Sequence, residues 1–152
     1  MGLAILRLAL GTVFVAHGVP KLFPVWGGSP AITAAFFDSL GLGPALPLAL
    51  AVGVVEVVGG LALLAGAYAR WVAFVLAIEL AAAAWSAHLP SGFFINWKLD
   101  AGVGHGFEFH LVLIAALACL VLSGAGALSV DGHRTRAAET DRLGRARLRR
   151  SN

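Results

Sequence analysis

The chain has few charged residues and almost no cysteine. Only 12% of its 152 residues are charged, roughly half the share of an average soluble domain. The single cysteine, Cys119, excludes a disulfide scaffold, a zinc site built from several cysteines and an internal dithiol relay. By contrast, 59% of the residues are hydrophobic and the mean hydropathy is +0.87. The length allows one domain at most, and the composition predicts that this domain lies in lipid.

The positive charge of the chain is confined to its end. Residues 1–130 carry four basic and five acidic residues, whereas residues 131–152 carry seven arginines and three acidic residues. The net charge of +3 therefore belongs to a tail and not to a body that could follow a nucleic acid. The sequence contains no recognisable nucleic-acid module, and we expect no nucleic-acid partner.

Four stretches are long and apolar enough to cross a bilayer as helices, some of them with polar groups inside. They lie at about residues 3–22, 46–65, 71–89 and 107–123. Their apolar surface would be unfavourable in water, and a lipid core cannot hydrogen-bond an open backbone, so helices are expected. We predict an all-α integral membrane four-helix bundle over residues 1–130 and a basic tail over residues 131–152.

The basic residues also predict an orientation. Arg70 and the tail should lie on the cytoplasmic side, and an even number of spans places the N-terminus there too. Both termini are therefore predicted to be cytoplasmic, in a multi-pass protein of the cytoplasmic membrane. The loops over residues 23–45 and 90–106 then face outward. A short amphipathic piece at residues 32–40 is expected to lie along the membrane surface.

Helical spacing indicates which residues of the first two spans face the bundle. Five residues of the first span share one face, and His17 flanks it: Arg7, Gly11, Phe14, Gly18 and Lys21. Four residues of the second span form a similar stripe: Ala49, Gly53, Glu56 and Gly60. Small residues let a neighbouring backbone approach closely, so both faces are predicted to point toward the centre.

The same reasoning assigns faces on the other two spans. Glu79 is predicted to face inward, whereas His88, nine residues later, is half a revolution away at 100° per residue. Glu108 and His110 cannot both face inward. Glu108 shares its side with the small residues Ala115, Cys119 and Ser123, so we take Glu108 as the interior residue. Cys119 is then expected to be an inert packing residue in apolar surroundings.

Ionisable groups at membrane depth are costly and indicate function unless they are paired. Arg7, Glu56 and Glu79 are predicted to form a polar network near the midplane. Arg7 with Glu56 or Glu79 is read as a structural ion pair that holds the helices in register. The alternative is a proton relay that serves quinone chemistry.

A second group of polar residues is predicted to gather at the outer end. His17, Lys21, Glu108 and His88 are candidates to hydrogen-bond a quinone carbonyl or an anionic small molecule and to shuttle its proton. A purely structural polar network is an equally weighted alternative. Metal or haem ligation by His17 with His88 or His110 is disfavoured, because the sequence has no paired-histidine motif such as HExxH.

Short motifs follow one another along residues 3–131. They are Arg7-Leu8-Ala9-Leu10-Gly11, His17-Gly18-Val19-Pro20-Lys21-Leu22-Phe23, Thr33-Ala34-Ala35-Phe36-Phe37 with Leu40-Gly41, Gly53-Val54-Val55-Glu56-Val57-Val58-Gly59-Gly60, His88-Leu89-Pro90-Ser91-Gly92-Phe93-Phe94, Gly106-Phe107-Glu108 and Leu128-Ser129-Val130-Asp131. Each motif alone is weak, but the ordered set resembles the DoxX family of small four-helix bacterial membrane proteins. The segment 96–105 lengthens the last loop relative to the compact form of that family.

The resemblance implies redox work at a membrane without fixing a substrate. Members of the family resemble the small subunit of an archaeal thiosulfate:quinone oxidoreductase, and others are linked to membrane thiol and superoxide defence. We therefore expect a small redox-associated protein that serves as a subunit of a quinone-linked oxidoreductase. Its pocket is expected to face a quinone or another small molecule. The sequence itself requires no cofactor. The alternatives are a non-catalytic assembly or partner-stabilising protein and, less favoured, a proton-coupled transporter. A membrane protein partner or self-association is expected.

Overall fold

The molecule is built of helices joined by short turns and two longer loops. A computed structural model describes residues 1–151, with side chains for residues 1–145; residue 152 of the predicted tail lies outside the described part. No strand occurs among the described residues, which confirms the all-α prediction. The elements are α1 (Gly2–Leu22), α2 (Pro30–Ser39), α3 (Ala45–Ala65), α4 (Ala69–Ala83), a π-helical turn η1 (Ala84–His88), a 3₁₀ turn η2 (Leu89–Ser91), α5 (Glu108–Ser123) and α6 (Val130–Ser151).

Three helical segments are long and apolar enough to cross a membrane. They are Gly2–Leu22, Ala45–Ala65 and the continuous segment Ala69–Ser91. The fourth apolar helix, Glu108–Ser123, has only 16 residues. All four helices occupy the apolar stretches of the sequence. The chain therefore suits a lipid environment.

Local sequence signals explain where several helices begin and end. Ser29 caps α2 by accepting a hydrogen bond from the Ile32 amide at 3.2 Å, and Pro30 follows at the first helical position. Gly66 ends α3 in the left-handed conformation, with φ +69°. The turn that follows is so short that α3 and α4 run antiparallel.

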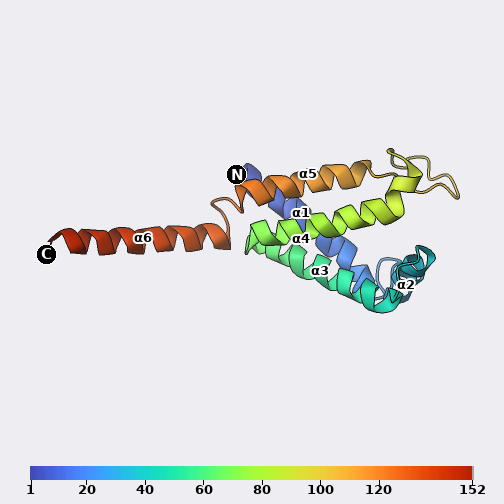
Figure 1. The fold of residues 1–152 in the computed structure, drawn as a ribbon, viewed down its shortest axis with the longest axis horizontal. Coiled ribbons are helices and arrows are strands. Elements are labelled where there is room, and N and C mark those ends of the chain that lie inside the picture. Colours follow the sequence, from blue (N-terminus) through green and yellow to red (C-terminus); the bar gives the residue numbers. More distant parts are fainter. Residues whose placement is uncertain (152) are drawn as a thin grey trace.

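The helices form two pairs, α1 with α3 and α4 with α5. Figure 1 shows that the pairs diverge toward the end that carries α2 and the loop over residues 92–107. The N-terminus, the turn between α3 and α4 and the start of α6 lie at the opposite end (Figure 1). The divergence leaves room between the pairs at the end near α2.

The two glycine-containing faces of α1 and α3 pack directly against each other. A β-carbon on Gly11 would lie 2.7 Å from the Gly60 carbonyl oxygen, and one on Gly60 would lie 2.8 Å from the Gly11 carbonyl oxygen. No side chain fits at either position without separating the two backbones. The predicted inward faces of the first two spans are therefore confirmed.

The α5 helix turns a different face inward from the predicted one. Leu113, Leu117 and Leu120 are buried, and they pack with Leu76 of α4 in the apolar core. The side with the small residues faces outward, and Cys119 is exposed. The assignments of Glu108 as interior and of Cys119 as a buried packing residue were therefore wrong. Large leucines fill the wider space between α4 and α5, where no close backbone approach requires small residues.

Arg7 does not pair with Glu56 or Glu79, so that prediction was wrong. Its guanidinium donates hydrogen bonds to the carbonyl oxygens of Leu63 and Leu64, both at 2.9 Å, and of Leu128 at 2.6 Å. These are carbonyls of the last turn of α3 and of the loop before α6. Along α1, Arg7 lies about three turns away from the position that faces Glu56. The unpaired carbonyl groups at the end of α3 are much closer to Arg7 than Glu56 is.

Asp131 completes this junction between α3, α4 and the start of α6. Its two carboxylate oxygens accept hydrogen bonds from the Tyr68 and Ala69 amides, each at 2.9 Å, and its own amide donates to the Gly66 carbonyl at 3.0 Å. The carboxylate therefore caps the N-terminus of α4, where negative charge is favourable. The rest of the predicted tail continues as α6, which projects from the body (Figure 1).

Candidate functional site

A cavity of about 640 Å³ lies between the diverging helix pairs, at the end that carries α2. Residues from α1, α2, α3, α4, the π-helical turn and α5 line it, and most of its wall is apolar. Its ionisable lining residues are His17, Lys21, Glu56, Glu79, His88, His105 and His110. A mostly apolar pocket with a few converging polar groups is the usual form of a small-molecule site.

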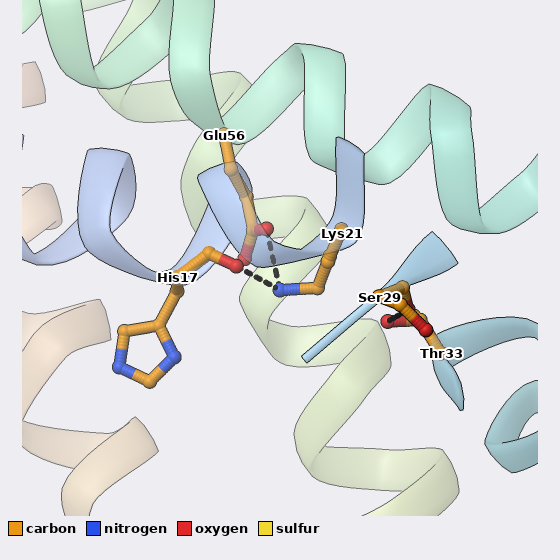
Figure 2. Close-up of polar contacts among 5 residues, drawn as sticks. All are labelled: His17, Lys21, Ser29, Thr33 and Glu56. Atoms are coloured by element: carbon orange, nitrogen blue, oxygen red, sulfur yellow. Dashed lines mark hydrogen bonds and ion pairs between the residues drawn. The ribbon is translucent and has the colours of Figure 1, made fainter. Parts of the chain in front are cut away.

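Lys21 and Glu56 form an ion pair inside this cavity. The Lys21 Nζ atom lies 2.5 Å from Glu56 Oε2 and also donates to the His17 carbonyl oxygen at 2.9 Å, as Figure 2 shows. The exposed fractions of the two side chains are 19% and 7%. The lysine side chain runs back toward the N-terminus of α1, the direction in which helical side chains point. It thereby brings Glu56 of the predicted midplane network together with His17 and Lys21 of the predicted outer group.

The π-helical turn places His88 on the cavity. Its hydrogen bonds run from residue i to i+5, so this stretch winds more slowly than an α-helix and shifts the direction of later side chains. Glu79 and His88 consequently line the same cavity. The prediction that they point to opposite sides was wrong, because it assumed 100° per residue throughout.

His88 is held by two neighbours. Its Nδ1 atom donates to the His105 carbonyl oxygen at 2.9 Å, since a carbonyl can only accept. Its ring lies against the His110 ring, with centroids 4.0 Å apart and an interplanar angle of 36°. The other ring nitrogen, Nε2, is then free to accept a proton or a hydrogen bond when His88 is neutral.

The loop over residues 92–107 holds His105 in place. The Glu108 amide donates to the Phe93 carbonyl at 2.9 Å and the Gly106 amide to the Phe94 carbonyl at 3.0 Å. The Phe93 ring also meets the Phe107 ring edge-on, with centroids 5.3 Å apart. These contacts close the base of the loop, where Ile95, His105 and Gly106 line the cavity.

Two polar atoms of the cavity have neither a hydrogen-bond partner nor an ion-pair partner among the described residues. They are Glu79 Oε2 and His110 Nδ1, and both are buried. Buried polar groups are nearly always satisfied, so each such atom calls for an explanation. A ligand that hydrogen-bonds to both atoms from within the cavity would explain both.

Four of the predicted site residues and two of the predicted network residues have now been placed. His17, Lys21 and His88 line the cavity together with Glu56 and Glu79, whereas Glu108 does not. His110 also lines it, although the prediction placed His110 on the outward side, and so does His105, which no prediction singled out. The spacing of His110 with the buried leucines of α5 was the available signal for His110. No local sequence pattern indicates His105.

We expect that replacing Lys21 with methionine destabilises the protein by about 2 kcal/mol, because Glu56 keeps a buried carboxyl group without its partner. Replacing both residues, as Lys21→Met with Glu56→Leu, should restore most of the loss. Denaturation with sodium dodecyl sulfate in mixed micelles measures these differences.

Lys98→Met is the matched control, since Lys98 is exposed in the loop and should contribute little. If the double variant lost as much stability as its two single variants combined, Lys21 and Glu56 would not act as a pair.

Comparisons with known proteins identify the family. The family model described as DoxX matches residues 2–89, from the start of α1 through the π-helical turn. A protein of Haemophilus influenzae, described as "Uncharacterized protein", is 31% identical over 85% of this chain and 87% of its own length. A Bacillus subtilis protein named "Putative oxidoreductase CatD" is 29% identical over 86% of this chain and 85% of its own length. No solved structure matches the chain significantly. The predicted resemblance is confirmed, and the chain belongs to the DoxX family of membrane proteins.

Proposed function

We propose that this protein crosses the bacterial inner membrane four times, with both termini in the cytoplasm, and binds a quinone in the cavity near the outer end. In this proposal it is the small subunit of a membrane redox system, and a partner supplies the electrons.

The distribution of charge supports this topology. At about 1.5 Å per residue, the 16 residues of α5 span roughly 24 Å, and a bilayer adapts to a shorter helix of this kind by thinning locally. Arg7 binds carbonyls at the end of α3 and Arg70 lies in the first turn of α4. Figure 1 shows these helix ends and the start of the arginine-rich α6 at the end opposite α2, where the cavity lies. Cytoplasmic ends carry the excess of arginine and lysine, and this supports an outward-facing cavity.

The unpartnered atoms Glu79 Oε2 and His110 Nδ1 in an apolar cavity are the observation on which the proposal depends. A quinone has a flat apolar ring that suits such walls and two carbonyl oxygens that accept hydrogen bonds. Its reduction takes up two electrons and two protons. The Lys21 ammonium offers a donor to one carbonyl, and Glu79 and His110 are placed to hold and deliver protons.

The name of the Bacillus relative agrees with redox work, since it contains the word oxidoreductase. The matched family region includes five of the seven ionisable residues of the cavity, all except His105 and His110. The proposal thus concerns a site that is built largely from the family's own part of the chain.

A short-chain quinone analogue tests the proposal directly. Added to the detergent-solubilised protein, it should raise the melting temperature in a saturable way. Glu79→Gln and His110→Leu should each weaken its binding by about tenfold, the effect of losing one hydrogen bond with a charged or strongly polar group.

Glu108→Gln is the matched control, because it makes the same chemical change one face away from the cavity. A wild-type protein whose melting temperature does not change when the analogue is added would contradict the proposal. So would an equal loss of affinity in Glu79→Gln and Glu108→Gln.

A partner-stabilising role without catalysis is the second candidate, and the projecting helix α6 favours it. This helix is exposed along its described length from Arg134 to Arg145, so it offers a surface to another protein. Crosslinking with mass spectrometry should then find one reproducible membrane partner, and cavity variants should leave that crosslink unchanged. Loss of the partner in the cavity variants would instead connect it to the quinone site.

A further inference from the structure

A second cavity, also of about 640 Å³, lies at the opposite end of the molecule from the first. It is formed by the start of α4, the loop over residues 123–127 after α5, and the first two turns of α6. The proposed quinone site shares no residue with this cavity. Its lining combines three arginines, Arg70, Arg134 and Arg136, with two aromatic residues, Tyr68 and Trp71.

Among the side chains that the structure describes, the arginines of this basic cavity have no carboxylate partner. Within residues 1–145, no ion pair involves Arg70, Arg134 or Arg136. The only acidic residue in the lining is Asp131, and both its oxygens already accept backbone hydrogen bonds from the start of α4. Three positive charges therefore converge with their charge largely uncompensated, which favours an anionic ligand.

Contacts with the surrounding chain position the three arginines. The Arg136 Nη2 atom donates to the Ala127 carbonyl oxygen at 2.7 Å. The Arg134 guanidinium lies over the Tyr68 ring, 5.2 Å from its centroid, in a cation–π contact. Arg70 comes from α4 and packs against the loop at Gly124, where a β-carbon would lie only 3.1 Å from the Arg70 Nε atom. The three come from two helices that are far apart in sequence, and they meet around one space.

The position of the basic cavity indicates the source of the anion. It lies at the end of the membrane-suited helix that starts at Ala69, beside Trp71, whose side chain is 73% exposed. Tryptophan and tyrosine settle at the level of the lipid headgroups. Basic pockets between membrane helices at this level bind anionic headgroups. We propose that this cavity binds the phosphate group of an anionic glycerophospholipid, whose acyl chains lie along the apolar surface of α4.

Titration with lipids of different headgroups tests this assignment. The full-length protein in detergent is titrated with short-chain phosphatidylglycerol, with phosphatidylcholine of the same chain length, or with inorganic phosphate, and its melting temperature is followed. Phosphatidylglycerol should raise the melting temperature of the wild type. Phosphatidylcholine and inorganic phosphate should have little effect.

Two double variants that lose the same charge distinguish binding at this cavity from a general attraction between anionic lipid and a basic protein. Arg70→Gln/Arg134→Gln should bind phosphatidylglycerol roughly 30-fold more weakly, as expected for two lost basic contacts at an anionic surface. Arg142→Gln/Arg145→Gln removes two arginines of α6 outside the cavity and should leave binding unchanged. Each shift is measured against the lipid-free melting temperature of the same variant, so a change in basal stability does not obscure it.

Equal weakening in both double variants would overturn the proposal, because binding would then follow net charge alone. An equal shift with phosphatidylcholine would also overturn it, and inorganic phosphate that reproduced the full shift would exclude a lipid as the ligand. Native mass spectrometry of protein released from membranes gives an independent measure. The wild type and the control should retain phosphatidylglycerol, and Arg70→Gln/Arg134→Gln should lose it.

Discussion

A Gly60→Val variant is expected to lose the packing of α1 against α3 and to unfold in mild detergent. A β-carbon at this position would lie 2.8 Å from the Gly11 carbonyl oxygen and 2.9 Å from the Val15 amide nitrogen. Both contacts are with backbone atoms, so no side-chain rotation relieves them, and the helices must move apart. Overpacking of a close-packed interior commonly costs about 1–3 kcal/mol, and we expect a cost above about 3 kcal/mol here.

The measurement is the fraction of protein recovered as a single folded species, together with its unfolding by sodium dodecyl sulfate. Ala51→Val is the matched control, since Ala51 lies on the exposed side of the same helix and has room for the added carbons. A Gly60→Val protein as stable as this control would show that α1 and α3 are not in close contact at that point.

The second large effect is expected for Arg7→Met. The substitution leaves the carbonyl oxygens of Leu63, Leu64 and Leu128 without the guanidinium that now donates to them. Hydrogen bonds to charged groups contribute about 1.5–3 kcal/mol each, and the loss of three is not additive. We expect a total destabilisation of about 3–5 kcal/mol, measured by the same unfolding experiment.

Arg7→Lys should recover only part of this loss, because a single ammonium group cannot reproduce the planar fork of donors. Arg145→Met provides the control, since Arg145 is exposed and pairs only with Asp141 on the same helix. That change should cost less than about 0.5 kcal/mol. Equal stability of Arg7→Met and Arg145→Met would rule out the role of Arg7 as the link between α1, α3 and the loop before α6.

The two helix faces that could be predicted were those with a physical need for small residues. Gly11 and Gly60 mark a close backbone approach, and that requirement is visible in the spacing of the sequence. On α5 both sides are apolar, so hydrophobicity does not distinguish the lipid-facing side from the packed side. Choosing the small-residue side there placed Glu108 inside and His110 outside, the reverse of the structure.

The partners of the ionisable residues were harder to predict than their faces. Arg7 and Glu56 do share a bundle-facing position, yet Arg7 binds the carbonyls at one helix end and Glu56 binds Lys21. A side chain of this length reaches several candidates, and only the relative depth of the helices decides among them. His105 lies on the cavity because of a long loop, whose path no helical periodicity describes.

The π-helical turn at the end of α4 has a consequence for how such a site could arise and be lost. A turn of this kind holds one surplus residue within an otherwise regular helix. Removing one codon from the stretch that encodes residues 84–87 would restore regular winding, and eight residues at about 100° each would leave His88 about 80° from Glu79, still on the cavity side. Restoring regular winding without removing a residue would instead turn His88 half a revolution from Glu79 and away from His110. The surplus residue and the position of His88 therefore depend on each other, and the histidine pair survives only if both are kept or both are adjusted together.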